Sequence, residues 1–350
     1  MKFNNILITF FTLSIITILG LSIIQSNKPK AVLSPYIYVH EVVDQNQDRI
    51  FRSNDGGNNT ENIITGSKIQ AFGQNNKYIL YSKGEKNKKT QLELYNNETK
   101  NSNTIFIEGD QYISKIIPIP NKFIFLYEAV STEFRSYQAR IGIYDFINNK
   151  FESPNPQLLA KDVSELYANN EGTLAVFTGF NNYKYVMDLN NYENIKRIPT
   201  NFNYTSGFIN ENILVAGKYN SEEVMFINLL DNSTTTSKIE YKFYESYIST
   251  DNKNLFYSVR EDPEKNIFYR LSDTNAMINL YDTEVSYITP NLSYDQQFLL
   301  FKKVTKENQE KEKDYKISGS INNQIGILDI KKNYTVITPM KGVGYQFEFK

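Results

Sequence analysis

Histidine and cysteine carry much of the nucleophilic and metal chemistry of proteins, and this chain contains one histidine, His40, and no cysteine. Without cysteine there can be no disulfide, no thiolate nucleophile and no cysteine-ligated metal site. A Ser-His-Asp triad would have to use His40, which lies in an alternating segment typical of a strand, and the sequence has no Gly-x-Ser-x-Gly motif. The sequence therefore predicts no enzyme activity and no cofactor.

Carboxylates are the remaining candidates for chemistry, since two acids suffice for glycoside hydrolysis and the chain has 39 Asp and Glu. No catalytic pair stands out among them. Asp145, Asp188 and Asp329 each end an apolar segment at equivalent places, where a side chain that caps a turn explains them. Residues Asp44–Asp48 begin like a calcium loop, but Arg49 takes the position that requires glycine. We predict no metal site.

The balance of charges limits the kinds of partner. The chain has 38 basic and 39 acidic side chains and a formal net charge of −1, so it lacks the positive field that nucleic-acid binding requires. Aromatic residues make up 14% of the chain, as 26 Tyr and 23 Phe without Trp. Together with frequent Asn, this mix favours strands and turns. We expect an all-β protein that does not bind nucleic acid.

An apolar segment precedes the expected strands. Residues 6–24 carry no charge and as a helix would span about 28 Å, enough to cross a bilayer. The segment is longer than the apolar region of a usual signal peptide, and poor cleavage sites follow it. We predict an uncleaved transmembrane signal anchor in residues 1–25 and a linker in residues 26–35. The N-terminus would be cytoplasmic and the rest of the chain extracytoplasmic; the alternative is secretion after cleavage.

A short pattern recurs six times after the linker, a turn with Asn or Asp followed by an apolar strand. Its equivalent apolar positions lie 40 to 50 residues apart, the length of a four-stranded propeller blade. A second strand that ends in a polar turn follows most copies, as in residues 141–145 and 325–329, and this fits antiparallel hairpins. The six equivalent positions are Ile79, Ile124, Leu174, Leu214, Leu255 and Leu299.

The two ends of the chain supply the strands of one more blade. Residues 343–349 have the pattern of an innermost strand, and residues 36–42, 49–52 and 61–65 have that of three outer strands. Pairing between the ends would leave no open edge in the ring. We predict an all-β propeller of four-stranded antiparallel blades in residues 36–350, preceded by one transmembrane helix, with seven blades and with six as the alternative.

The recurring turn plus Asn/Asp-x-x-(apolar)-Leu-x-Tyr/Phe resembles the WD-like repeats of TolB-like and dipeptidyl-peptidase-N-terminal-like bacterial propellers, over residues 36–350. Ser249-Thr250-Asp251 and Ser293-Tyr294-Asp295 keep part of the Ser-Pro-Asp-Gly turn of those families, whereas the other copies replace Asp with Asn. The Trp-Asp and Gly-His dipeptides of WD repeats proper are absent. Such propellers serve binding, scaffolding and several chemistries, so the resemblance implies a fold and leaves the function open.

Three connections between predicted strands are longer than a hairpin requires, and equivalent connections of a propeller emerge on one face. They run over residues 83–90, 130–140 and 303–323. Exposed aromatic residues beside Arg are typical anchors of protein interfaces. We predict a partner-binding face that includes Lys86, Lys88, Phe134, Arg135, Tyr137, Arg140, Lys306 and Glu310.

Two functions are compatible with these features. The first is a membrane-anchored, non-catalytic protein-interaction or scaffolding module, whose short linker restricts its protein partner to the membrane or cell envelope. The second is a glycan-binding or glycan-active propeller that uses Tyr, Phe and carboxylates around a central channel, although strand packing also explains the abundant Tyr. Deleting residues 130–140 should abolish partner binding under the first and spare sugar binding under the second. The oligomeric state is not predicted.

Overall fold

The computed structural model of the chain describes residues 35–349 with internal gaps. The described ranges are 35–44, 47–66, 68–84, 90–105, 111–130, 137–154, 163, 165–179, 183–198, 204–208, 211–217, 221–243, 249–251, 254–262, 265–271, 277–283, 291–293, 297–303, 307–308, 311, 321–332 and 334–349.

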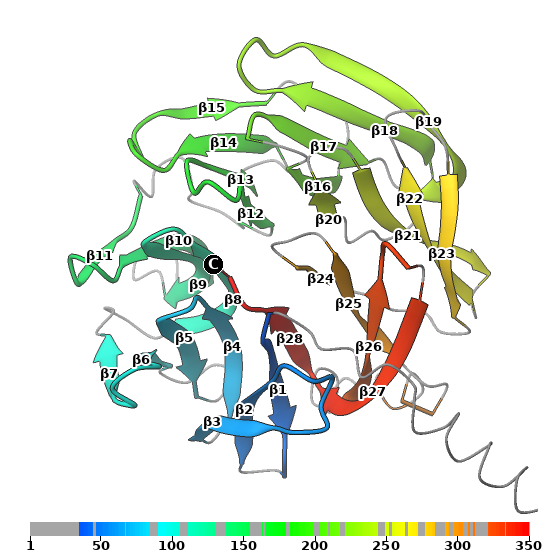
Figure 1. Ribbon diagram of the computed structural model, residues 1–350. Coiled ribbons are helices and arrows are strands. Elements are labelled where there is room, and N and C mark those ends of the chain that lie inside the picture. The colour runs from blue at the N-terminus through cyan, green and yellow to red at the C-terminus, as the bar shows by residue number, and fades with distance from the viewer. Residues whose placement is uncertain are drawn as a thin grey trace, which may run out of the picture.

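These residues form antiparallel β-strands that pair into four-stranded sheets (Figure 1). One sheet combines the last strand of the chain with the first three strands of the chain, in the order β28-β1-β2-β3. Each of the other six sheets consists of four consecutive strands. The strands are β1 Ile37–Val42, β2 Asp48–Ser53, β3 Glu61–Gly66, β4 Ile69–Gln74, β5 Tyr78–Lys83, β6 Gln91–Asn96, β7 Ser102–Ile105, β8 Gln111–Ile119, β9 Lys122–Val130, β10 Tyr137–Asp145, β11 Lys150–Glu152, β12 Leu166–Ala168, β13 Leu174–Thr178, β14 Lys184–Asp188, β15 Ile195–Arg197, β16 Tyr204–Phe208, β17 Ile213–Gly217, β18 Ser221–Asn228, β19 Thr234–Phe243, β20 Ser249–Asp251, β21 Asn254–Asp262, β22 Lys265–Leu271, β23 Met277–Thr283, β24 Asn291–Leu292, β25 Phe298–Lys303, β26 Asn323–Asp329, β27 Tyr334–Gly342 and β28 Gly344–Phe347.

The sheets stand side by side in a ring, with one strand of each sheet toward the centre (Figure 1). The inner strands β28, β4, β8, β12, β16, β20 and β24 each neighbour the next one around the ring. The six apolar strands of the repeated sequence pattern are the second strands of six sheets, for instance β5 and β25. The fold is a β-propeller, and each sheet is one blade.

The propeller has two unlike faces because successive strands of a blade run in opposite directions. We call the face with the connections from first to second and from third to fourth strands the turn face. The insertion face carries the connections from second to third strands and from each blade to the next. Its two longest connections are residues 153–165 and 304–322, whereas the longest on the turn face is residues 54–60. The elaborated connections therefore gather on one face.

The core lies between neighbouring blades, so both faces of a strand are buried. Along β9, Phe123, Phe125 and Tyr127 pack into the cluster shared with the preceding blade, whereas Ile124 and Leu126 pack into the cluster shared with the next. A strand buried on both faces reads as a continuous apolar run instead of an alternation. This burial explains the Phe-Ile-Phe-Leu-Tyr run of the repeat.

Side-chain amides hold the closing strand on both sides. Strand β28 pairs with β1 from Ile37 opposite Phe347 to His40 opposite Gly344. On one side Gln74 donates to the Phe347 carbonyl and Gln346 donates to the Phe72 carbonyl at 3.0 Å. On the other side the Phe347 amide donates to Asn291 Oδ1 at 3.0 Å. The C-terminal strand is thus bonded to inner strands of two neighbouring blades as well as to β1.

Two third strands carry a glycine under a phenylalanine of the second strand. Gly326 lies opposite Phe301 in the register, and Gly142 lies opposite Phe125. A Cβ atom at position 326 would lie 2.2 Å from Cζ of Phe301, which is fully buried. Each Ile-Gly-Ile segment therefore requires its glycine, because the phenylalanine ring that covers it leaves no space for a side chain.

Gly326→Ala should lower the free energy of unfolding by about 1–3 kcal/mol, because the buried Phe301 ring must leave its position. Urea denaturation followed by tyrosine fluorescence measures the change. Gly66→Ala is the matched control, since a Cβ there meets no atom within 4 Å, and it should stay within about 0.5 kcal/mol of wild type. Equal stabilities of the two variants would contradict the packing described.

The predicted fold class needs correction. It combined seven blades, the seventh built from both ends of the chain, with a preceding transmembrane helix; the structure shows six blades of consecutive strands and one composite sheet, made from both ends of the chain, that closes the ring. No helix among residues 35–349, as far as they are described, is long and apolar enough to span a bilayer. The predicted span at residues 6–24, with the anchor in 1–25 and most of the linker in 26–35, lies outside the described residues. The fold shown is an all-β propeller of four-stranded antiparallel sheets.

Candidate partner-binding face

The turn face is built from tight turns that one polar side chain caps. Asp145 Oδ1 accepts hydrogen bonds from the amides of Ile147 and Asn148, both at 2.9 Å. Burial opposes ionisation of Asp145, but these bonds outweigh it and lower its pKa below the ordinary value. Asx caps of this kind close turns. The same arrangement recurs at Asn75, Asn96, Asn169, Asp188, Asn228 and Asp329. The prediction that Asp145, Asp188 and Asp329 cap turns is confirmed.

His40 is buried toward the insertion-face end of β1. Its Nε2 lies 3.5 Å from Oδ2 of Asp48, and its ring contacts the edge of Phe72. The same Asp48 oxygen accepts a hydrogen bond from the Ile69 amide at 2.6 Å. Asp48 therefore joins the first blade to the start of β4, and its bonds are those of a carboxylate that holds two blades together.

The residues predicted for partner binding lie at the insertion face or outside the described residues. Arg140 is in β10 opposite Tyr127, partly buried, and its Nε has no hydrogen-bond partner among the described residues. Tyr137 begins β10 opposite Val130, so the connection itself is shorter than predicted and comprises residues 131–136. The structure does not describe Lys86, Lys88, Phe134, Arg135, Lys306 and Glu310. The strands that flank these six place all three connections on the insertion face.

A buried ionic cluster lies at the same face, between the blades of β8 and β12. Lys184 is 2% exposed, forms an ion pair with Glu165 and donates to Thr178 Oγ1 at 2.6 Å. Thr178 in turn donates to Glu165 at 3.0 Å. Lys115 from β8 donates to the Leu166 carbonyl at 2.7 Å. The cluster carries two ammonium groups and one carboxylate, so it is a positive site in the wall of the ring.

Burial lowers the pKa of Lys115 to about 8, although the charge of Glu165 opposes the shift. Its ammonium lies 4.3 Å from the centre of the Tyr167 ring, which covers it. Sequence reasoning missed Lys115, Glu165 and Lys184. A lysine inside an apolar strand was a usable signal, but its partners come from the next blade, and contacts between blades are not visible in the sequence.

The rate at which Lys115 is acylated should rise with pH and reach half of its maximum near pH 8. An ordinary lysine with a pKa of 10.5 becomes nucleophilic only at higher pH. The measurement is acetylation by a short pulse of an amine-reactive ester at a series of pH values, read at each lysine by mass spectrometry. Lys115→Met removes the modified peptide and controls for its assignment. A midpoint for Lys115 two pH units higher would contradict the burial of its ammonium.

Comparisons with known proteins place the fold. No protein-family model matches the sequence, and no curated protein is significantly similar to it. TolB from Acinetobacter baumannii is similar in structure at a TM-score of 0.52 and 13% identity, over 90% of this chain and 83% of that one. The uncharacterized protein lmo1340 from Listeria monocytogenes EGD-e is similar at 0.58 and 13% identity, over 89% and 95%. A chain of the Mitotic Checkpoint Complex is similar at 0.50 and 11% identity, over 75% and 82%.

At these identities the likeness shows the fold alone. By its fold the chain is therefore a β-propeller protein. Its propeller fold is similar to that of TolB, and this confirms the predicted fold as far as it rested on the resemblance of the repeats to TolB-like propellers.

Proposed function

We propose that this chain is a non-catalytic protein-interaction or scaffolding module, an extracytoplasmic propeller held at the cell envelope by an N-terminal membrane anchor. The fold supports the first part, because a propeller presents a rigid surface on which loops can be varied without changing the scaffold. The uncharged run at residues 6–24 supports the anchor.

The observation that carries the proposal is the unequal elaboration of the two faces. The turn face consists of short capped turns, and the longest connections, residues 153–165 and 304–322, both leave from the insertion face. Function concentrates in such connections on a rigid scaffold. The partner would therefore dock on the insertion face.

The residue types at one connection fit an interface anchor. Residues 131–136 include Phe134 and Arg135, and they join strands β9 and β10 at that face. Arginine and aromatic side chains dominate the energetic centres of protein interfaces. Arg140 lies in the same hairpin, and its buried Nε donates no hydrogen bond to any described residue.

The test is crosslinked co-purification of the full chain from detergent-solubilised membranes, with bound proteins identified by mass spectrometry. A matched control is the anchor with its linker, residues 1–35, which retains any lipid association and lacks the propeller. The proposal expects envelope proteins that crosslink to the full chain and not to the control. Repeated recovery of the same proteins with both would contradict a role of the propeller in binding.

A further inference from the structure

The described chain begins and ends at the turn face. Strand β1 starts at Ile37, which pairs with Phe347 at the end of β28. Strand β1 is the second strand of its blade and therefore runs from the turn face to the insertion face, as its connection to β2 at residues 43–47 shows. Whatever precedes residue 35 must therefore leave the propeller from the turn face.

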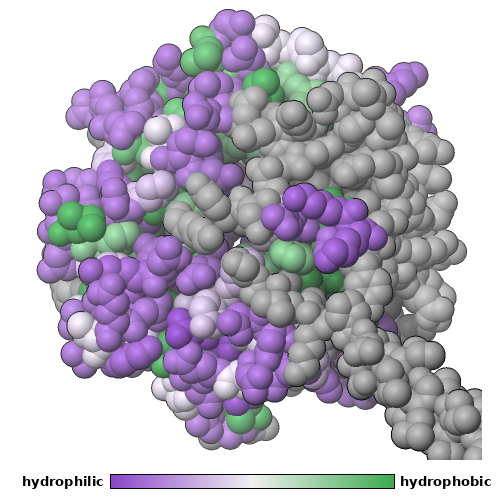
Figure 2. All heavy atoms as spheres, in the orientation of Figure 1, coloured by the Kyte–Doolittle hydropathy of each residue, from purple (hydrophilic) through white to green (hydrophobic). Residues whose placement is uncertain are grey.

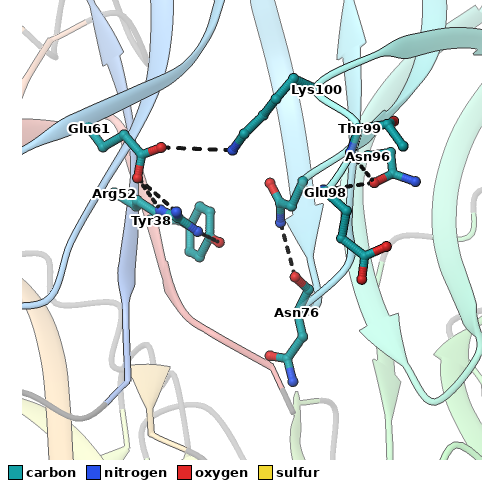
Figure 3. Close-up of polar contacts among 9 residues, drawn as sticks. Tyr38, Arg52, Glu61, Asn76, Asn96, Glu98, Thr99 and Lys100 are labelled. Atoms are coloured by element: carbon teal, nitrogen blue, oxygen red, sulfur yellow. Dashed lines mark hydrogen bonds and ion pairs between the residues drawn. The ribbon is translucent and has the colours of Figure 1, made fainter.

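Several contacts fix this point of departure. The ring of Tyr36 stacks under the guanidinium of Arg52 at 4.4 Å, and the Tyr36 carbonyl accepts from the Glu348 amide at 2.8 Å. Arg52 donates to Glu61 at 2.8 Å, and Lys100 of the next blade lies 3.8 Å from the same carboxylate, as Figure 3 shows. Tyr36 is thus held by Arg52 and Glu348 of its own blade, and Arg52 is linked through Glu61 to Lys100 of the next blade. These contacts fix the place where the described chain begins.

Two exposed apolar side chains lie at the outer turns of the same face. Ile147 is 66% exposed in the turn between β10 and β11, and Leu230 is 75% exposed in the turn between β18 and β19. Both occupy the same place in their turns, because each donates its amide to the capping side chain, Asp145 or Asn228. On the face drawn in Figure 2, the described surface is mainly hydrophilic, with hydrophobic atoms in separate spots.

The part of the chain outside the structure limits which surface can approach these tips. The ten linker residues 26–35 reach at most about 36 Å when fully extended. Strand β1, where the described chain enters the propeller, has six residues and measures about 20 Å from end to end. If the insertion face lay on the bilayer, the linker would have to run the height of the propeller along its outside, which takes more than half of its reach. With the turn face on the bilayer, no such extension is needed.

We infer that the turn face lies against the membrane surface, with Ile147 and Leu230 at the level of the lipid head groups, so that the insertion face points away from the membrane. The inference rests on the anchor in the proposed function. It deepens that function because it assigns lipid to one face and the protein partner to the opposite face. Amphipathic contacts of this kind add apolar burial to an existing anchor.

The absence of cysteine makes single-site labelling the direct test. Full-length Ile147→Cys and Leu230→Cys, each carrying a small fluorophore, are reconstituted in liposomes whose lipids bear a quencher at the head group. Val43→Cys and Tyr183→Cys are matched controls, because they replace apolar residues 50% and 37% exposed on the insertion face. Tyr183→Cys also removes a cation–π contact with Arg197, which is worth about 0.5–1 kcal/mol at an exposed site. The other three substitutions should leave stability within about 0.5 kcal/mol. We expect several-fold stronger quenching at the two turn-face positions.

The outcomes separate this inference from the function on which it rests. Equal quenching at all four positions in protein that floats with the liposomes would overturn the orientation and leave the anchor standing. Stronger quenching at Val43 and Tyr183 would reverse it. Failure of the full chain to float with liposomes would overturn both the anchor and the membrane contact, while partner capture by the propeller would still be measured separately.

Discussion

Ending the chain at Gly342 should abolish cooperative folding. This truncation removes β28, whose Tyr345 and Phe347 are buried in the core of the closing sheet. Burying two aromatic side chains stabilises a fold by about 5 kcal/mol, which is of the same order as the whole stability of a domain. The truncation also exposes the edge of β1, which an edge of another molecule can pair with.

Thermal unfolding followed by circular dichroism should show a sharp transition for the full chain and a broad one, or aggregation, for the truncated chain. Gln346→Ala is the control within β28, because it removes only the bond to the Phe72 carbonyl. We expect it to cost about 1 kcal/mol. A truncated chain with the transition temperature of the full chain would show that closure by β28 does not hold the ring together.

Glu165→Gln should destabilise the propeller by about 3–5 kcal/mol, because it leaves the ammonium of Lys184 buried without its counter-charge. Burial already lowers the pKa of Lys184, against the opposing effect of Glu165. In the variant the folded-state pKa falls further below that of the unfolded chain. The unfolded chain then binds more protons over a wider pH range, so the stability of the variant rises as pH increases.

Urea denaturation at several pH values measures this effect, and a double-mutant cycle identifies its cause. Lys184→Met removes the buried charge and leaves Glu165, which is 25% exposed and can be hydrated. The double variant Glu165→Gln with Lys184→Met should recover most of the stability lost in Glu165→Gln. A double variant as unstable as the sum of the two single variants would mean that the two charges do not interact.

The repeat in the sequence predicted the second strands of the blades well, because they are buried on both faces and follow an Asn or Asp turn. Ile79 in β5 and Leu299 in β25 lie where the pattern placed them. The turn caps were also predictable, since Asp145 and Asp329 act within their own turns. Local patterns are readable when one segment contains both partners of the interaction.

Contacts between blades were not predictable in the same way. Lys115 meets the Leu166 carbonyl, and Gln74 meets that of Phe347, across sequence separations that no local pattern records. The extent of the connection at residues 130–140 was overestimated because Tyr137–Arg140 continue the β10 ladder opposite β9. The hydrogen bonds of Gln and Asn side chains around β28 likewise depend on which strands become neighbours in the ring. The sequence pattern does not reveal which side chains make these bonds.

The most direct test of the account is to shorten one insertion-face connection in the full, anchored chain and measure partner recovery. Val130 pairs with Tyr137, so Asn-Gly in place of residues 131–136 closes the hairpin with its register intact. The control is Leu230→Ser on the turn face. We predict that crosslinked partner recovery falls at least tenfold in the shortened chain and is unchanged in the control, with equal transition temperatures. Undiminished recovery after shortening, or an equal loss in Leu230→Ser, would contradict binding through the insertion face.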